Sequence, residues 1–559
     1  MRTHLSSLRR NLTIQILILA TLFPGLIHFP TAVHANPRGA NVVAGNVNIS
    51  GLGTRRVDII QNSNRAIINW QQFNIQKGEI TQFRQRGGGT ALNRVVTGDP
   101  TAIYGQLRAN GSVVLINPNG IVVGPSGTVD VAGMLTMSTL DTTNEDFLNG
   151  GRARYKGNTA AGVVNYGAIS SATGDVVLLG NFLQNSGSVS APQGTVAFGA
   201  GGEILVNETA SGGKISVIAG GVGGATGISN SGSIDGAAAE LKAHGNVYAL
   251  AIQNDGVVRA SGYNFSGGRL TLSAGPQGSI VNTGQLIARN SDGSGGRIDI
   301  DANNISLDAG TVDVSGAPGM QGGEVNVTGN GVEVAAATSI AADGSVGGSV
   351  RVSGQRLAAV DGAISATGDV GNGGFIDVSA SEVTVGSTAS MDVSGVTEGG
   401  RVRVGGGFQG NEADINNSNS TAIDAGASFF ADAIGGDAGT IVIWSDGDTL
   451  FRGEASAQAF GAFGDGGLIE ISGRQNLTYD GGHVSTRSAN GNTGTLLFDP
   501  VDVEISRVAS GTATITIEAL FGAAPGTDGW NNPSTVGGLI HDNHVVIHTS
   551  GDGGEGDIT

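Results

Sequence analysis

A glycine pair followed by alternating apolar and polar residues recurs along the second half of this chain. Segments 295–300 (GGRIDI), 322–327 (GGEVNV) and 399–404 (GGRVRV) are examples, and the second glycines of the first six such units lie 25 to 28 residues apart. Alternation with a period of two is typical of strands that bury one face and expose the other. A unit of this length cannot bury its apolar face alone, so the repeat predicts a stack of units, which is a solenoid.

A second repeat, of the form Asn-x-Gly-x-apolar, precedes the glycine-pair units. Its asparagines are Asn165, Asn185, Asn230, Asn254 and Asn282, so successive copies start 20, 45, 24 and 28 residues apart. We expect the gap of 45 residues to hold two units, one of them degenerate. Asparagines repeated at one corner predict a ladder of stacked side-chain amides. We expect the glycine pairs to supply positive φ angles at other corners.

These repeats predict an all-β chain folded as a right-handed parallel β-helix. Glycine makes up 97 of the 559 residues and aromatic residues only 5%. This composition disfavours propellers, whose blades of about 40 residues carry aromatic signatures. An uncovered first coil would expose unpaired strand edges, so we expect a cap at the N-terminal end. Trp70 and Phe73 are predicted to be core or cap residues there.

Residues 1–35 have the features of a secretory signal peptide. Three arginines precede an apolar stretch from residue 12 to 23, and the small residue at position 35 predicts cleavage before Asn36. An uncleaved anchor helix is the alternative interpretation. No later segment approaches 18 consecutive apolar residues, so we expect no transmembrane segment in the mature chain.

The composition excludes several classes of function. The formal net charge is −18, which disfavours nucleic acid as a partner, because such binding requires Lys and Arg to displace phosphate counterions. The chain has no Cys, so it has no disulfide framework, thiolate metal site or thiol nucleophile. We expect no cofactor.

The segment from residue 36 to about 158 carries the most distinctive motifs. They include 67–75 (IINWQQFNI), 91–95 (ALNRV), 103–111 (IYGQLRANG), 114–124 (VLINPNGIVVG) and 137–141 (MSTLD). In this order they resemble the haemagglutination-activity, or two-partner-secretion, domain of filamentous-haemagglutinin-like exoproteins. The later segment 496–500 (LLFDP) resembles a further element of the same family.

The resemblance implies an export mechanism. Such domains are recognised in the periplasm by a dedicated outer-membrane β-barrel transporter with periplasmic binding modules, and the chain crosses unfolded before it winds into a β-helix outside. The residues that would carry transporter recognition here are Asn93, Arg94, Val95, Asn117, Pro118, Asn119, Gly120 and Ile121.

Structural roles are the alternative for these residues. The segment 117–120 has Pro at the second position, Asn at the third and Gly at the fourth, which is typical of a β-turn. Arg94 could equally be a packed arginine that bonds nearby carbonyl groups.

An enzymatic function is disfavoured by the residues that the strand pattern turns outward. Aligning the glycine-pair units gives one outward column of residues 269, 297, 324, 349, 375 and 401, and a second of residues 271, 299, 326, 351, 377 and 403. Both are mixed in charge, as a solvated face is, and neither shows the pair of carboxylates that glycoside hydrolysis needs. His541, His544 and His548 form the one histidine cluster of the sequence, and the last two would lie about 13 Å apart on a strand, too far to share a metal ion.

We therefore expect five regions: a signal peptide (1–35), the capped secretion head (36–158), Asn-x-Gly coils (159–290), glycine-pair repeats (291–500) and the start of a further repeat region (501–559), which we interpret as truncated. The expected function is that of a secreted or surface-displayed adhesin-type exoprotein that binds an unknown host, glycan or cell-surface receptor. A contact-dependent toxin stalk without its effector and a secreted β-helical polysaccharide-active enzyme are the alternatives.

Overall fold

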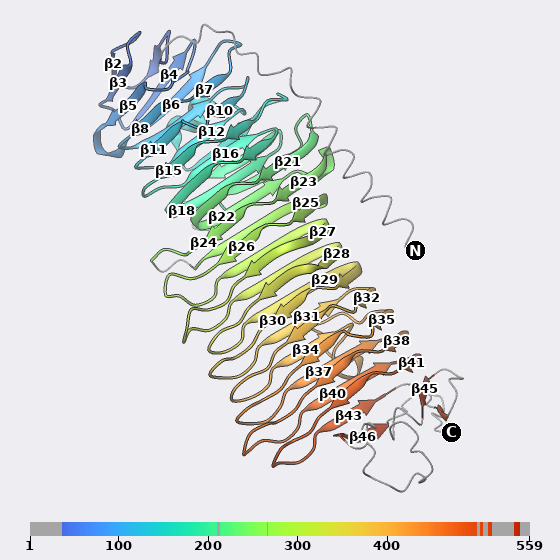
Figure 1. Cartoon of the computed structure of the whole chain (residues 1–559). Coiled ribbons are helices and arrows are strands. Elements are labelled where there is room, and N and C mark those ends of the chain that lie inside the picture. The colour runs from blue at the N-terminus through green and yellow to red at the C-terminus, as the bar shows by residue number, and fades with distance from the viewer. Residues whose placement is uncertain are drawn as a thin grey trace.

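The computed structural model describes residues 36–208, 213–264, 267–499, 504–506, 513–516 and 542–547. The predicted signal peptide, His541, His548 and most of the 501–559 region lie outside these residues. Strands stack along a single axis from the N-terminal end of the described chain to the C-terminal end (Figure 1). The chain is an all-β, right-handed parallel β-helix with a capped N-terminal end, as predicted.

Each coil contributes three strands, and each strand pairs in parallel with the strand one coil away. For example, β10 pairs with β7, β11 with β8, and β12 with β9. This pairing defines three sheets. Sheet 1 contains β3(Arg56–Gln61), β5(Ile80–Gln85), β8(Gln106–Ala109), β11(Thr128–Val131), β15(Ala168–Ser171), β24(Val257–Ala260), β26(Gln285–Ala288), β30(Ala363–Ser365), β33(Ser390–Asp392), β36(Ser428–Phe430), β39(Glu454–Ser456) and β42(His483–Ser485).

Sheets 2 and 3 repeat this arrangement on the other two sides. Sheet 2 contains β4(Arg65–Trp70), β6(Thr90–Val95), β9(Ser112–Ile116), β12(Leu135–Ser138), β16(Val176–Gly180), β31(Phe375–Ser379), β34(Arg401–Val404), β37(Thr440–Ser445), β40(Leu468–Gly473), β43(Thr495–Phe498) and β46(His544–Ile547). Sheet 3 contains β7(Thr101–Ile103), β10(Ile121–Val123), β14(Val163–Asn165), β17(Leu183–Asn185), β21(Gly224–Asn230), β23(Tyr248–Asn254), β32(Glu382–Val385), β35(Ser420–Ile423), β38(Asp448–Phe451), β41(Asn476–Tyr479), β44(Glu504–Ser506) and β45(Ala513–Thr516).

Six longer strands bend around corners and belong to more than one sheet. They are β18(Ser188–Ala200), β22(Ser233–Ala243), β25(Arg269–Asn282), β27(Arg297–Asp313), β28(Glu324–Ala341) and β29(Ser349–Val360). Short 3-10 turns lie at η1(Arg86–Gly88), η2(Gly245–Val247) and η3(Phe408–Gly410). Alternate Val, Ile and Leu side chains of all three sheets point inward and form one continuous core cluster along the axis.

The predicted asparagine ladder is confirmed. All five asparagines are buried, and each of the first four donates from Nδ2 to the Oδ1 of the next over 2.8, 2.7, 2.7 and 2.7 Å. Stacking therefore satisfies these buried amides within the column, which hydrogen-bonds one coil to the next.

The expected role of the glycine pairs is wrong. None of the pairs in the repeat has a positive φ. Instead, a Cβ at Gly323 would lie 2.1 Å from the carbonyl oxygen of Gly296, and one at Gly348 would lie 2.1 Å from that of Gly323. Glycine is required because consecutive coils pack backbone against backbone at this corner.

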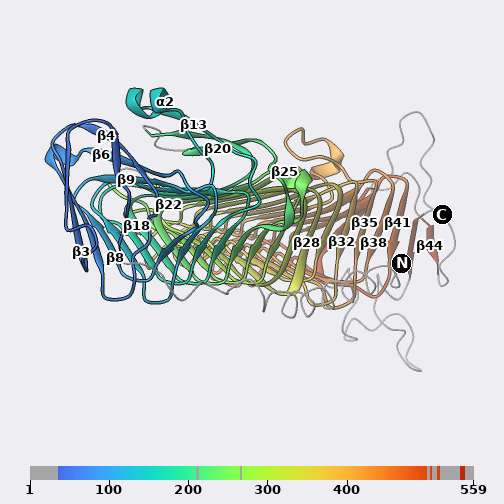
Figure 2. The same ribbon diagram turned by 90° about the horizontal axis from the view of Figure 1, so that it is seen from above.

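The 45-residue gap does not hold a degenerate coil. Asn185 pairs directly with Asn230, so the extra residues belong to one coil. They leave the solenoid as β19(Glu203–Asn207) and β20(Ile215–Ala219), which form an antiparallel sheet with β13(Arg152–Lys156). Figure 2 shows this three-stranded sheet and helix α2(Asn144–Asn149) outside the solenoid, above one side of the stack.

The expected cap is present at the N-terminal end. Strand β1(Asn41–Ala44) runs antiparallel to β4, and β2(Val47–Ser50) runs antiparallel to β3. Both cover the edge of the first coil. Trp70 and Phe73 are fully buried in the core, with ring centroids 5.6 Å apart in an edge-to-face contact, so they are core residues.

Candidate functional site

The segment 117–121 forms the predicted β-turn between two strands of the head. The amide of Gly120 donates to the carbonyl oxygen of Asn117 over 3.1 Å. The buried Asn117 side chain donates from Nδ2 to the carbonyl oxygen of Asp99 and to Thr101 Oγ1, each over 2.9 Å. Its Oδ1 accepts from the amide of Asn119 over 3.0 Å. Asn117 therefore joins the turn to the preceding coil.

Asn93, Arg94 and Val95 lie at the end of β6, and their side chains are engaged within the head. Asn93 is buried and accepts a 3.0 Å hydrogen bond from the indole nitrogen of Trp70. Arg94 pairs with Asp141 over 2.9 Å and donates to the carbonyl oxygen of Thr142 over 2.8 Å. The packed arrangement weighed for Arg94 is the one observed.

The eight predicted recognition residues differ in their solvent exposure. Asn119 is exposed, Pro118 and Arg94 are partly exposed, and the others are buried. The buried members shape the folded head, whereas Asn119 stands at its surface and donates from Nδ2 to the carbonyl oxygen of Thr97 over 2.7 Å. Recognition of these residues by a transporter stays a prediction.

A second hydrophobic cluster lies outside the solenoid, and the sequence reasoning missed it. Tyr155 of β13, Ile204 of β19 and Phe147 of α2 pack on outward side chains of sheet 2, including Ile116 and Leu179. The signal that could have found it is the apolar alternation in residues 152–156, 203–207 and 215–219, together with the excess length of the 45-residue gap.

The two outward columns predicted from the glycine-pair units are confirmed in register. Arg269, Arg297, Glu324, Ser349, Phe375 and Arg401 align across successive strands, as do Thr271, Asp299, Asn326, Arg351, Asp377 and Arg403. The expectation of a solvated face is wrong at the C-terminal end. Asp377 and Arg403 are buried beneath residues 405–418, an insertion that the repeat pattern does not contain.

Arg403 is the centre of this covered region. Its guanidinium binds Asp377 over 2.8 Å, Glu412 over 2.6 Å and Asp414 over 2.8 Å. Glu470, two coils further along the same face, is fully buried and accepts from the amide of Gln409 over 2.9 Å. Burial raises the pKa of Glu470 to about 7 because it disfavours the charged form.

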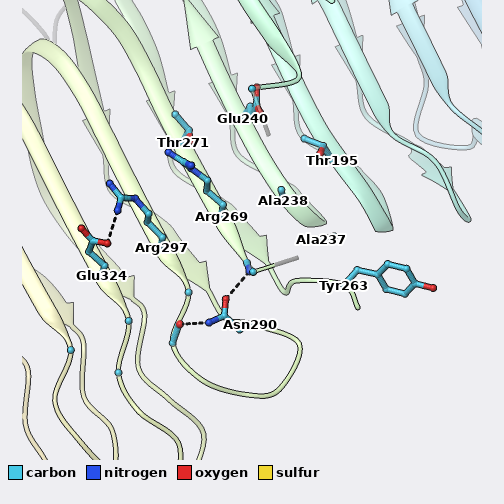
Figure 3. Close-up of a pocket in the computed structure, with 18 of the residues that line it drawn as sticks. Thr195, Ala237, Ala238, Glu240, Tyr263, Arg269, Thr271, Asn290, Arg297 and Glu324 are labelled. Carbon is cyan, nitrogen blue, oxygen red and sulfur yellow. Dashed lines mark hydrogen bonds and ion pairs between the residues drawn. The ribbon is translucent and has the colours of Figure 1, made fainter. Parts of the chain in front are cut away.

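A groove of about 1270 Å³ runs along the outer face of sheet 2 between these two covered regions. Its floor comes from β22, β25, β27, β28, β29 and β31, and Lys214 of the extrahelical segment stands at its N-terminal end. Figure 3 shows Glu240, Arg269, Thr271, Arg297 and Glu324 projecting from consecutive strands of this floor. The groove is a second feature that sequence reasoning missed, because it is bounded by the two insertions.

Among the described residues, no group of three or more His, Asp or Glu side chains is placed to hold a metal ion. In the same part of the chain, no helix has the length and apolar character needed to cross a bilayer.

The N-terminal half of the chain is similar to known proteins. Residues 34–288 match the family model of the TPS secretion domain. Two proteins of Haemophilus influenzae named heme/hemopexin-binding protein are similar: one is 30% identical over 188 residues, covering 32% of this chain and 20% of the relative, and the other is 36% identical over 112 residues, covering 20% and 12%. The chain thus spans a fifth or less of the length of these relatives.

Two solved structures are also similar. The HMW1 secretion domain from Haemophilus influenzae is 24% identical, with a TM-score of 0.39, covering 82% of this chain and all of that domain. A filamentous hemagglutinin secretion domain is 16% identical, with a TM-score of 0.30, covering 68% of this chain and all of that domain. On the family match over residues 34–288, this chain carries a TPS secretion domain, the domain of two-partner-secreted exoproteins.

Proposed function

We propose that the N-terminal domain directs export of this chain through an outer-membrane β-barrel transporter with periplasmic binding modules. The observation that carries the proposal is the TPS secretion domain match over residues 34–288, a region that contains the cap and the Asn117 turn. The predicted signal peptide would bring the chain to the periplasm first.

Two physical properties of the chain support export in an unfolded form. Without cysteine, no disulfide can lock the chain before it enters a pore. In the solenoid each strand pairs with strands one coil before and one coil after it, so coils can form in order as they emerge outside. Each added coil would bury apolar surface and bias the direction of export.

The proposed role outside is that of a secreted or surface-displayed, adhesin-type binding protein. Its support is the long, repeat-built outer surface. A contact-dependent toxin stalk remains the rival, which a globular effector on a longer gene product would favour. We assign the chain no catalytic role, and release of sugar products from a polysaccharide panel would overturn that assignment.

Capture of heme or a heme-carrying protein is a second candidate. The names of the two Haemophilus influenzae relatives favour it. Titration of the purified chain with hemin tests it: a saturable shift in the heme absorption band supports the candidate, and an unchanged spectrum rejects it.

The export proposal is tested by co-expressing the full chain with an outer-membrane transporter of the two-partner type and measuring extracellular yield. Asn117→Ala and Asn119→Ala should retain the product in the cell envelope, because each removes side-chain bonds that tie the turn to residues 97–101. Asn372→Ala is the matched control, since Asn372 is an exposed loop asparagine in a distal coil whose side chain donates to Glu398 and accepts from Thr397. Normal yield of the head variants, or yield that does not depend on the transporter, would refute the proposal.

A further inference from the structure

The loops that join sheet 1 to sheet 2 form one corner of the solenoid, and in the distal half of the chain this corner is apolar. Six large side chains of these loops are each 40–79% exposed: Met320, Val346, Val370, Ile434, Phe460 and Phe463. We call these six side chains the apolar ridge. Parallel bridges join five of the loops in order, at Gly344, Gly368, Gly395, Ala433 and Ala459. The ridge therefore follows the solenoid axis along one edge of the stack (Figure 1).

The apolar ridge is not a chance scatter of exposed residues. Between residues 289 and 499 it contains every exposed large apolar side chain except Phe375, which begins the strand after one of the loops. At these exposed fractions the six side chains present on the order of 600 Å² of surface. A contiguous apolar patch of this size marks an interaction site, because monomeric soluble proteins rarely expose one.

The charges beside the ridge restrict what can cover it. Four exposed acids stand in the same loops: Asp369, Glu398, Asp437 and Asp465. None of the four has an ion-pair partner among the described residues, and the loops that carry the ridge contain no Lys or Arg. The partner therefore has to be cationic as well as able to bury apolar surface. This requirement disfavours an anionic membrane surface and a second ridge packed directly on this one.

The N-terminal end of the same chain has the complementary charge. Residues 36–158 contain 12 Lys or Arg and 7 Asp or Glu, whereas residues 289–499 contain 9 Lys or Arg and 26 Asp or Glu. The two ends of the solenoid are thus opposite in net charge, so two copies attract each other when the end of one meets the distal half of the other.

The cations of the N-terminal end exceed the acids beside them. Four arginines are exposed on sheet 1 and at its corner with sheet 2: Arg56, Arg84, Arg86 and Arg108. Asp58 is shared by Arg56, over 2.9 Å, and Arg84, over 3.5 Å. Asp130 lies in register with Arg108, and Arg86 has no ion-pair partner in the described part of the chain. Four arginines against two acids leave this face with excess positive charge.

The two ends of the corner also differ in shape. In the first three coils the connections from sheet 1 to sheet 2 are residues 62–64, 86–89 and 110–111, which are mostly Gly, Asn and Ser. In the distal half they lengthen to residues 431–439 and 457–467, which carry the last three side chains of the ridge. The long apolar loops of one copy can therefore rest on the short connections of another.

We propose that a second copy of this chain covers the apolar ridge, with the two solenoids side by side and antiparallel. Arg86 follows the second strand of sheet 1 from the N-terminal end, and Phe463 follows the second from the C-terminal end, so the two meet when the described solenoids are aligned along their full length. A two-fold axis closes this arrangement and repeats the contact. The two ridges alone contribute on the order of 1,200 Å², the lower end of the range for a stable interface.

Sedimentation velocity of the purified full chain tests the association. We expect the sedimenting mass to double as concentration rises through the micromolar range. The dimer should weaken as salt rises, because exposed charges are screened. Val346→Ser/Val370→Ser should weaken the dimer by about tenfold or more, because it removes apolar surface from the centre of the ridge.

The matched control is Val96→Ser/Val222→Ser. These valines are 56% and 55% exposed in loops that lead into sheet 3, against 43% and 61% for the two ridge valines. The control removes the same kind of side chain at similar exposure and should change the dissociation constant by less than about twofold. Circular dichroism establishes that both variants keep the β fold.

A charge exchange tests the antiparallel orientation. Arg84→Glu/Arg86→Glu should also weaken the dimer by about tenfold or more. Adding Asp437→Lys/Asp465→Lys to the same chain should restore it, since each contact then regains opposite charges. A chain that stays monomeric at low salt, equal losses in the two valine variants, or a charge exchange that restores nothing would overturn the proposal. The measurements need no transporter, so failure of export and failure of self-association are distinguishable.

Discussion

Removing one asparagine from the middle of the buried ladder should destabilise the secretion domain by a definite amount. Asn230 accepts from Asn185 Nδ2 and donates to Asn254 Oδ1, each over 2.7 Å. In Asn230→Ala both bonds are lost. Asn254 Oδ1 is then left without this donor, and Asn185 Nδ2 keeps only a 3.3 Å contact with the carbonyl oxygen of Ser233.

The expected cost follows from the number of buried groups left unsatisfied. Each of the two groups costs about 1–3 kcal/mol, so Asn230→Ala should lower local stability by about 2–6 kcal/mol. Asn282 ends the ladder and is bonded to one asparagine, so Asn282→Ala should cost about half as much. Asn476 makes an exposed 2.6 Å bond to Asp448, and Asn476→Ala should cost less than about 1 kcal/mol.

Hydrogen–deuterium exchange is the suitable assay, because a solenoid can open locally without unfolding as a whole. Peptides that cover β17, β21 and β23 should lose protection in Asn230→Ala, and peptides of distal coils should not. Thermal unfolding followed by circular dichroism gives the same order of variants. If Asn230→Ala and Asn476→Ala were equally stable, or if Asn282→Ala were less stable than Asn230→Ala, the ladder would not be the source of this stability.

Three further substitutions test other parts of the packing. Burial raises the pKa of Glu470 from 4.5 to about 7. The folded state therefore holds this proton more tightly than the unfolded state, and the free energy of unfolding falls as the pH rises from about 4.5 to 7. In denaturant titrations, Glu470→Gln should stabilise the protein by about 3 kcal/mol at pH 8 and have no effect at pH 4.5. Gly348→Ala would place a Cβ 2.1 Å from the carbonyl oxygen of Gly323 and should lower the melting temperature, whereas Gly98→Ala meets open space and should not. Arg403→Gln takes from the buried Asp377 its nearest cation and leaves it only Arg351 at 3.4 Å. This variant should cost about 3–5 kcal/mol and should speed protease cleavage within residues 405–418.

Each of these three has an outcome that contradicts it. A pH-independent gain in Glu470→Gln would mean that burial does not shift this carboxyl group. Equal melting temperatures for the two glycine variants would mean that the coils can move apart without cost. Unchanged protease resistance in Arg403→Gln would mean that other contacts hold the covering segment.

The repeat predicted the solenoid because strand alternation and unit spacing can both be read from short stretches of sequence. Alternation of Ile298 with Asp299 and their neighbours fixes which side chains turn inward, and the spacing of units fixes which residues align in adjacent coils. The outward columns and the asparagine ladder follow from the same spacing of the repeat units. The glycine pairs show where prediction from the repeat fails. The sequence marks where glycine is needed, but Gly323 is needed because the preceding coil approaches it closely, not because of its own φ angle.

The accessible surface could not be predicted in this way, since it depends on where insertions fold back. Residues 201–223 and 405–418 interrupt the repeat, and the sequence does not specify which face each covers. The first insertion brings Lys214 to the N-terminal end of the groove. The second brings Glu412 and Asp414 onto Arg403. The same outer face of sheet 2 is therefore open at Arg297 and closed at Arg403.

This division has a consequence for how the chain can vary. A substitution at an inward or ladder position changes the contact between coils and therefore acts on the folding that we propose drives export. A substitution on the open part of sheet 2, such as Arg269, changes the groove without touching the core. The side chains that stack the coils and those that form the outer surface thus lie on opposite faces of the same strands, so a solenoid of this kind can vary its surface while keeping the stacking that forms it.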